Sequence, residues 1–287
     1  MLIVTGASGK LGGLVLEALL RLVPVDQIGV SVRDPRKLAN FAARGVRVRR
    51  GDYNDTDSLR HAWEGARRVL LVSSNAAASG GDSVKQHETA IAAAKELNVE
   101  RLLYTSQVSS SAQSHFPPGR DHAATEAMLA TSGLNWTALR HGFYVDSAIG
   151  MNAHAFESGV LAGPEDGKVA WTAHEDLAEV DARLLAGLEN FDGATPPLTG
   201  NEALDLAELA RLASEITGRT ITRQVISENT MIENAQDLGL PTRVLQILLG
   251  YYRASLAGEF AVTNPTLERI LGRKPLLIRN VLTRELG

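Results

Sequence analysis

The 287-residue chain contains no cysteine, which excludes disulfide bonds, thiolate catalysis, iron–sulfur clusters and cysteine-based zinc sites. No apolar run reaches the roughly 20 residues that a membrane span needs. The net charge of −4 gives no support for binding to nucleic acid or a membrane surface. A strand is expected from residue 2, which leaves no space for a signal or transit peptide. We therefore expect a cytoplasmic protein.

The sequence also lacks a zinc-binding pattern. His87-Glu88 has no second histidine to complete His-Glu-x-x-His, so no metal site is predicted. The composition is 44% hydrophobic and 22% charged, which predicts a packed core rather than disorder. The length suits one large domain or a domain with a smaller lobe.

The first twenty residues contain a strand, a glycine-rich turn and a helix in that order. Gly6, Gly9 and Gly12 follow an apolar run, and the residues after them have helical periodicity. The free N–H groups and the dipole at a helix start form an anion site, typically for a pyrophosphate. Gly6 permits the tight turn, Gly9 admits the phosphate and Gly12 lets helix and strand approach. An ordinary strand–turn–helix connection is the alternative. The turn predicted to bind pyrophosphate comprises Gly6, Ala7, Ser8, Gly9, Lys10, Leu11 and Gly12.

Strand-like and helix-like segments alternate through the first half of the chain. Further strands are expected at 28–32, 46–49, 69–72, 101–104 and 136–139, and helices at 35–43, 56–63, 84–97 and 122–131. This alternation predicts an α/β fold with a doubly wound parallel sheet that binds its ligand at the carboxyl ends of the strands.

The regular alternation weakens after residue 150. A strand is expected at 169–172, a helix at 204–216, a strand at 220–226, and helices at 230–238 and 242–256. We therefore predict a dinucleotide-binding domain at 1–150 and a smaller C-terminal α/β lobe at 151–287 that binds substrate. The chain can cross between these lobes more than once.

The tip of the second strand decides which dinucleotide fits, because an acidic group there bonds the ribose 2′-hydroxyl whereas arginine accommodates a 2′-phosphate. Arg33 stands at this tip, twenty-one residues after Gly12, with Lys37 nearby. They predict NADPH in preference to NADH. Asp34 would weaken or reverse that preference if it pointed inward, and both basic residues would also suit a solvated helix start.

Polar residues follow three other predicted strands. Asp52 and Tyr53 follow the third strand, where the adenine would lie, although Asp52 also suits a turn. Ser73, Ser74, Thr105 and Ser106 stand at strand ends, where small hydroxyl groups fit the ribose and nicotinamide or satisfy local backbone.

The segments Thr5–Gly12, Val32–Pro35, Gly51–Tyr53 and Leu139–Tyr144 resemble the NmrA-like, atypical short-chain dehydrogenase/reductase family, nearly end to end. Within it, the chain is most similar to type 2 NADPH-dependent quinone oxidoreductases and triphenylmethane-dye reductases. The resemblance implies an oxidoreductase with an NAD(P)-binding Rossmann domain, a small C-terminal lobe, and a cleft between them for cofactor and substrate.

The sequence departs from the catalytic pattern of typical short-chain dehydrogenases. None of its five tyrosines is followed four residues later by lysine, so the Tyr-x-x-x-Lys pair is absent. NmrA-like relatives often place lysine and glutamate on the corresponding helix, where this chain has His122 and Glu126. These two share a helix face, and His122 is a candidate proton relay, or part of a local ion pair. Phe143 and Tyr144 are candidates for the wall of the substrate cleft, with Tyr144 orienting a carbonyl oxygen, or for an aromatic plug.

Together these features predict hydride transfer from NADPH to a small planar acceptor, a quinone first of all. The alternatives are an NADP(H)-binding redox sensor without catalysis and a reductase of another conjugated carbonyl, imine or dye. Monomer and homodimer are both compatible with the sequence.

Overall fold

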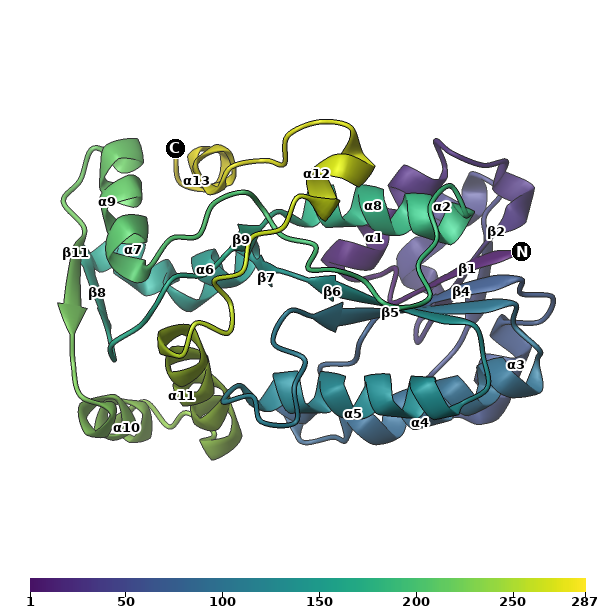
Figure 1. The fold of residues 1–287 in the computed structure, drawn as a ribbon, viewed down its shortest axis with the longest axis horizontal. Coiled ribbons are helices and arrows are strands. Elements are labelled where there is room, and N and C mark those ends of the chain that lie inside the picture. The colour runs from purple at the N-terminus through teal and green to yellow at the C-terminus, as the bar shows by residue number, and fades with distance from the viewer. The chain divides into compact units, whose positions relative to one another are not determined.

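Seven parallel strands form the central sheet of the computed structural model, which describes residues 1–287 (Figure 1). Their spatial order is β10-β6-β5-β4-β1-β2-β3, so the direction of winding reverses beside β1. This arrangement confirms the predicted doubly wound α/β fold. The strands are β1 (Leu2–Thr5), β2 (Ile28–Val32), β3 (Arg47–Arg50), β4 (Arg68–Leu71), β5 (Arg101–Gln107), β6 (Trp136–His141) and β10 (Gly193–Ala194).

Helices cover both faces of this sheet (Figure 1). One face carries α1 (Lys10–Leu19), α2 (Ala39–Ala43) and α8 (His174–Ala186), and the other carries α3 (Thr56–Ala62), α4 (Ser83–Glu96) and α5 (Pro117–Thr131). The strands present fully buried side chains to the helices; Ile3 and Leu102, for example, pack in one cluster with Trp63. Both faces of a parallel sheet are covered in this way because its crossover helices must pack back onto it.

Two helices differ from their predicted bounds for local reasons. The segment expected as one helix at 35–43 is a 3₁₀ turn, η2 (Pro35–Leu38), followed by α2, and the Asp34 side chain caps the turn. Helix α5 begins at Pro117 rather than at residue 122, because proline is well suited to the first turn of a helix. The remaining 3₁₀ turns are η1 (Val25–Gln27) and η3 (Ala76–Ser79).

The second half of the chain contains two small parallel sheets and several helices. Strand β8 (Val160–Gly163) pairs with β11 (Thr222–Val225), and β7 (Phe143–Tyr144) pairs with β9 (Trp171–Thr172). The strand expected at 169–172 is shorter because Val169 instead bridges Leu204 in antiparallel fashion. The helices are α6 (Val145–Met151), α7 (Ala153–Ser158), α9 (Leu206–Thr217), α10 (Glu228–Asp237), α11 (Thr242–Leu256), α12 (Thr266–Leu271) and α13 (Ile278–Leu286).

The chain forms two compact units. The first unit comprises Met1–Ser106, Asp121–Arg140 and His174–Pro196, and the second comprises Gln107–Arg120, His141–Ala173 and Pro197–Gly287. The units thus interleave along the chain, whereas the sequence predicts one boundary at residue 150 with further crossings allowed.

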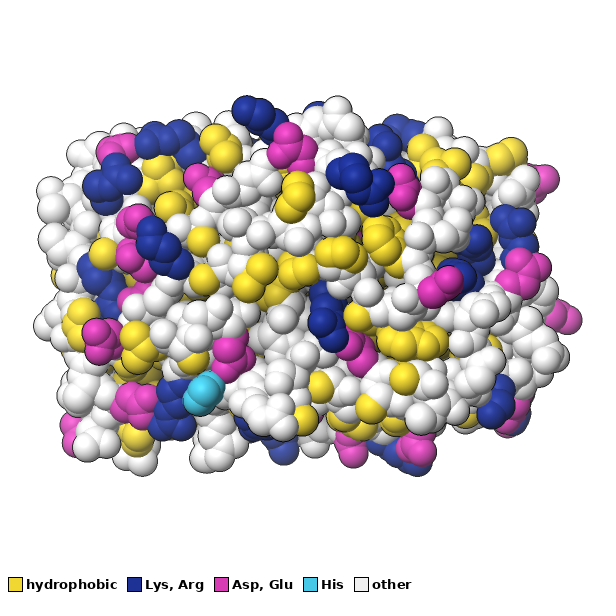
Figure 2. Space-filling view, in the orientation of Figure 1, with side chains coloured by type: hydrophobic (Ala, Val, Ile, Leu, Met, Phe, Trp, Pro, Cys, Tyr) yellow, Lys and Arg dark blue, Asp and Glu magenta, His cyan; other side chains and the backbone are white.

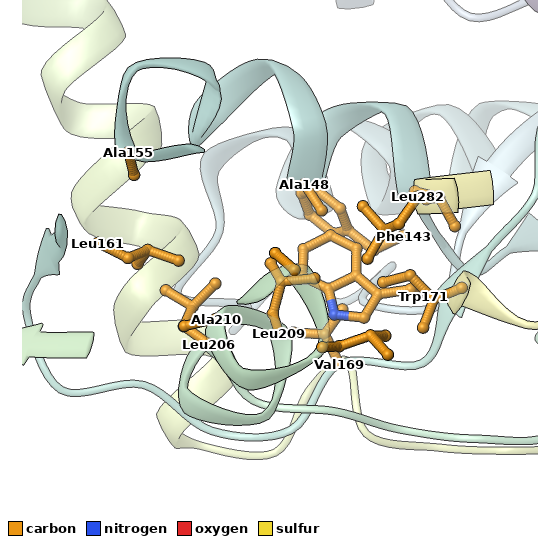
Figure 3. Close-up of a cluster of buried hydrophobic side chains, with 14 of the residues drawn as sticks. Phe143, Ala148, Ala155, Leu161, Val169, Trp171, Leu206, Leu209, Ala210 and Leu282 are labelled. Carbon is orange, nitrogen blue, oxygen red and sulfur yellow. The ribbon is translucent and has the colours of Figure 1, made fainter. Parts of the chain in front are cut away.

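The core of the second unit is rich in aromatic side chains. Phe143 and Trp171 lie against one another at its centre, beside Val169 and Leu209 (Figure 3). On the surface, Lys and Arg side chains are interspersed with Asp and Glu over the face shown in Figure 2. None of the helices combines the length and apolar composition that crossing a bilayer requires.

Candidate functional site

The glycine turn after β1 has the geometry that its sequence predicts. Gly6 has a φ of +61°, a left-handed conformation that favours glycine, and its carbonyl accepts a 2.9 Å hydrogen bond from the Gly9 N–H. A Cβ atom on Gly12 would lie 2.5 Å from the Gly6 carbonyl oxygen. Gly12 therefore lets α1 pass close to the turn, as we predicted for this glycine.

The N-cap position of α1 has no side chain that could accept from the first N–H groups of the helix. Gly9 is the N-cap residue, no side chain caps the helix, and its first turn contains no acidic residue. Ser8, Gly9 and Lys10 are exposed, whereas Ala7 and Leu11 are buried. Backbone N–H groups left in this way at a helix start, together with the helix dipole, favour an anion. The turn therefore fits the pyrophosphate of a dinucleotide.

Tyr53 ties this turn to the neighbouring strands. Its hydroxyl group lies 2.5 Å from Thr5 Oγ1 and donates a 2.8 Å hydrogen bond to the Val72 carbonyl. Thr5 Oγ1 also accepts the Val72 N–H at 2.8 Å. Burial raises the pKa of the Tyr53 phenol, which therefore stays neutral. Tyr53 thus fixes the ends of β1 and β4 together.

The Asp34 side chain is bonded to Arg36, two residues further along the chain. Its carboxylate accepts bonds from the Arg36 guanidinium at 2.8 and 3.0 Å and from the Arg36 N–H. The side-chain hydrogen bond from Arg36 lowers the pKa of Asp34. Arg33 and Lys37 are exposed. The basic side chains at the β2 tip are therefore open to a ligand, while the acidic one is engaged.

Asp52 forms a turn after β3, which is the alternative to adenine binding that the sequence allows. One carboxylate oxygen accepts the backbone N–H of Asn54 at 3.0 Å, which forms a turn after β3. The Asp52 N–H is bonded to the hydroxyl of Ser58, at the start of α3. This arrangement leaves further lone pairs on the carboxylate for a ligand.

Thr105 and Ser106 lie inside β5, which extends to Gln107 rather than ending at residue 104, and Thr105 is hydrogen-bonded to Ser73, which follows β4. The Ser73 N–H donates to Thr105 Oγ1 at 2.8 Å, and the Thr105 hydroxyl lies 3.2 Å from Ser73 Oγ. Ser74 Oγ donates to the side-chain amide oxygen, Oε1, of Gln86 at 2.5 Å. These contacts bring the carboxyl ends of two adjacent strands to one edge of the sheet, beside the glycine-turn strand.

His87 is a buried member of this group. Its Nε2 atom accepts the Ser74 N–H at 2.8 Å, and its Nδ1 atom lies 2.9 Å from Thr125 Oγ1. The Thr125 hydroxyl already donates to the Asp121 carbonyl, so it accepts the Nδ1 proton of His87. Burial lowers the pKa of His87 to about 3. His87 is therefore a neutral anchor for the loop after β4.

His122 and Glu126 have separate partners. His122 Nδ1 lies 2.7 Å from the hydroxyl of Tyr104, which is completely buried in β5. The Glu126 carboxylate accepts two bonds from the Arg140 guanidinium, at 3.1 and 2.6 Å, and one from Ser106 Oγ at 2.6 Å. The hydroxyl hydrogen of Ser106 is thus committed to Glu126. Toward a ligand, Ser106 offers lone pairs.

Phe143 and Tyr144, in the second unit, have different surroundings. Phe143 is 8% exposed and packs against the rings of Trp171, Phe260 and Tyr251. Tyr144 is half-buried, and its hydroxyl lies 3.3 Å from Nδ1 of the buried His141. Phe143 therefore belongs to the core, while Tyr144 is accessible.

Sequence reasoning missed His87, Thr125 and Arg140 as members of this arrangement. Arg140 carried a usable signal, because an arginine inside an apolar strand needs a carboxylate partner. His87 carried none, since its partners are a distant loop and a distant helix.

A family model described as NAD(P)H-binding matches residues 6–186. The chain is 33% identical over 273 residues to quinone oxidoreductase 2 of Escherichia coli, which covers 95% of this chain and 94% of that protein. It is 31% identical, over 98% of this chain and 93% of that protein, to an NmrA-like family domain-containing oxidoreductase of Aspergillus flavus.

Solved structures give the same result. The crystal structure of the E. coli NADPH-dependent quinone oxidoreductase complexed with NADPH superposes with a TM-score of 0.92, at 32% identity and full coverage of both chains. Triphenylmethane reductase from Citrobacter sp., complexed with NADP(H), gives a TM-score of 0.88 at 30% identity over 99% of each chain.

Proposed function

This chain belongs to the NAD(P)H-binding, NmrA-like family of oxidoreductases, and we propose that it transfers hydride from NADPH to a quinone. Membership confirms the resemblance inferred from the sequence. The observation that carries the proposal is the similarity, over the whole chain, to a quinone oxidoreductase complexed with NADPH. The first unit is proposed to bind the cofactor, and the second unit the acceptor.

The glycine turn supports cofactor binding. The N–H groups at the start of α1 would hold the pyrophosphate, with Gly9 leaving space for it. The hydroxyl residues at the carboxyl ends of β4 and β5 would hold the ribose and nicotinamide, with Ser106 accepting a hydrogen bond. Asp52 and Tyr53 would lie at the adenine end of the site.

The β2 tip supports NADPH over NADH. Arg33 and Lys37 are exposed and carry the positive charge that a 2′-phosphate needs. Asp34 would favour NADH, but its carboxylate is bonded to Arg36. The engagement of Asp34 by Arg36 supports the proposed preference for NADPH.

Quinone reduction requires little acid–base catalysis by the side chains of the protein. When bound, the nicotinamide supplies the hydride, and one proton from water completes the hydroquinone. The chain has to hold the flat acceptor in place and exclude water. Tyr144 is proposed to orient a carbonyl oxygen, and His122, bonded to Tyr104, is the candidate for relaying a proton. The absence of a Tyr-x-x-x-Lys pair is compatible with this reaction.

A stopped-flow assay with NADPH and 1,4-benzoquinone tests the proposal. We expect oxidation of NADPH at 340 nm that depends on the concentrations of enzyme and quinone. No turnover above the uncatalysed rate, with any quinone, would overturn it. Tight NADPH binding without turnover of any acceptor would instead indicate a redox sensor.

Dye reduction is a second candidate, because the chain is similar to a triphenylmethane reductase over nearly its whole length. The same assay with malachite green as the acceptor separates the two functions. A kcat/KM for the dye above that for every quinone would favour the second candidate.

A further inference from the structure

The second unit contains a pocket of about 400 Å³, within the range of small-molecule sites. Every lining residue belongs to that unit. Its walls are formed mainly by Phe116, Phe143, Met151, Ile247, Leu248 and Tyr251.

No charged side chain lines this pocket. Ser147 supplies one hydroxyl group, and the hydroxyl of Tyr251 is buried without a hydrogen-bond partner. An ionised ligand would lose its hydration and gain no counter-charge here, which is costly. Apolar and aromatic ligand surface, in contrast, is stabilised by such walls. The lining therefore selects for neutral, apolar groups.

The aromatic wall is fixed by packing. The centroid of the Phe143 ring lies 5.6 Å from that of Trp171, 4.9 Å from that of Phe260 and 5.6 Å from that of Phe116. Figure 3 shows Phe143 beside Trp171. Side chains held on several sides in this way lose little freedom when a ligand arrives. The wall is therefore preformed for a flat ring.

The opposite side of the pocket is open. Met151 is 38% exposed, and a Cβ atom on Gly150 would meet no heavy atom within 4 Å. Both residues lie at the end of α6. Glycine inside a helix disfavours the helix, yet here it leaves empty space over the pocket.

We propose that this pocket binds the neutral, apolar aromatic portion of the acceptor, so that fused-ring and alkyl-substituted quinones are preferred to small or ionised ones. The identification of the ligand as the acceptor rests on the proposed function, whereas the pocket's preference for neutral aromatic rings does not. Only Gly142 separates Phe143 from the end of β6 in the chain, so the wall begins close to a strand end.

The test measures binding without NADPH, by isothermal titration calorimetry of the full chain. The probes are 2-methyl-1,4-naphthoquinone, 1,4-benzoquinone and 9,10-anthraquinone-2-sulfonate. The absence of cysteine removes thiol addition as a side reaction. We expect methylnaphthoquinone to bind about tenfold tighter than benzoquinone, and the sulfonate more weakly than methylnaphthoquinone.

Gly150→Leu adds a bulky side chain at a residue that lines the pocket, without a clash at Cβ, and favours the helix, so the variant should fold. We expect it to weaken methylnaphthoquinone binding by about tenfold. Ala153→Leu adds the same side chain to an exposed position on α7 and should leave the affinity unchanged. Circular dichroism and light scattering verify fold and oligomeric state.

Equal affinity of Gly150→Leu and the wild type for methylnaphthoquinone, or tight binding of the sulfonate, would overturn the inference. A change in oligomeric state with unchanged quinone binding would also overturn it, and would identify the pocket as a contact between copies. If quinones bind as expected but NADPH is never oxidised, the proposed function fails and the pocket assignment stands.

Discussion

The Nε2 atom of His87 accepts a 2.8 Å hydrogen bond from the backbone N–H of Ser74, so this buried imidazole must be neutral in the folded protein. Its folded-state pKa of about 3, well below the usual 6.5, has burial as its main cause. His122 lowers this pKa further, and Asp82 opposes the shift. The unfolded chain therefore binds a proton at His87 that the folded chain excludes.

We predict that the free energy of unfolding falls as the pH drops below about 6.5 toward 3, by up to about 1.4 kcal/mol per pH unit from this group. His87→Gln cannot titrate and should show a flatter profile. Urea unfolding of both proteins at pH 7, 6 and 5 measures the difference. Parallel profiles would contradict a neutral, buried His87.

Gly9 and Gly12 should respond differently to alanine. A Cβ atom on Gly9 would lie 3.4 Å from the nearest atom, an ordinary contact, whereas one on Gly12 would lie 2.5 Å from the Gly6 carbonyl oxygen. We expect Gly9→Ala to weaken NADPH binding with an unchanged Tm, because its methyl group occupies phosphate space. Gly12→Ala should cost about 1–3 kcal/mol of stability. If Gly9→Ala lowered the Tm and left NADPH binding unchanged, the assignment of the pyrophosphate to this turn would be wrong.

Arg33→Ala should weaken NADPH binding by roughly ten- to a hundredfold, the loss of one charge-assisted contact, and leave NADH binding nearly unchanged. Fluorescence titration with both cofactors measures this. Arg21→Ala makes the same change in net charge at an exposed position and serves as the control. Equal binding of NADH and NADPH, unaffected by Arg33→Ala, would refute the cofactor assignment.

Replacing Tyr251 or Tyr53, each with a buried hydroxyl group, by phenylalanine should affect the stability of the protein differently. Tyr251 has no hydrogen-bond partner for its hydroxyl, so Tyr251→Phe should leave stability unchanged or raise it by about 1 kcal/mol. Tyr53 bonds Thr5 and Val72, so Tyr53→Phe should cost about 1–2 kcal/mol. Urea unfolding at pH 7 compares them. A loss of stability in Tyr251→Phe would show that its hydroxyl has a partner in solution.

The sequence predicted those elements whose signal is local. The first strand, glycine turn and helix were correct because apolar periodicity and glycine spacing act over a few residues. Strands β7, β9 and β10 have two residues each, too few to show a period, and β7 and β10 were missed. Their partners come from distant parts of the chain, which pattern alone does not identify.

The same limit applies to the site. Four-residue spacing placed His122 and Glu126 on one helix face, but the structure gives them partners from two strands, Tyr104 and Arg140. Spacing along a helix predicts which of its side chains can contact one another. The partners that they actually bond also depend on the side chains of the neighbouring strands. The sequence pattern around Arg33 likewise did not predict that the Arg36 side chain would bond Asp34.

The interleaved segments of the two units have a consequence for biosynthesis. Helix α8 and strand β10 belong to the first unit, yet His174–Pro196 follows two segments of the second unit in the chain. A ribosome must therefore translate past residue 196 before the sheet has all its strands, and a gene cut at residue 150 would encode a fragment without its last edge strand.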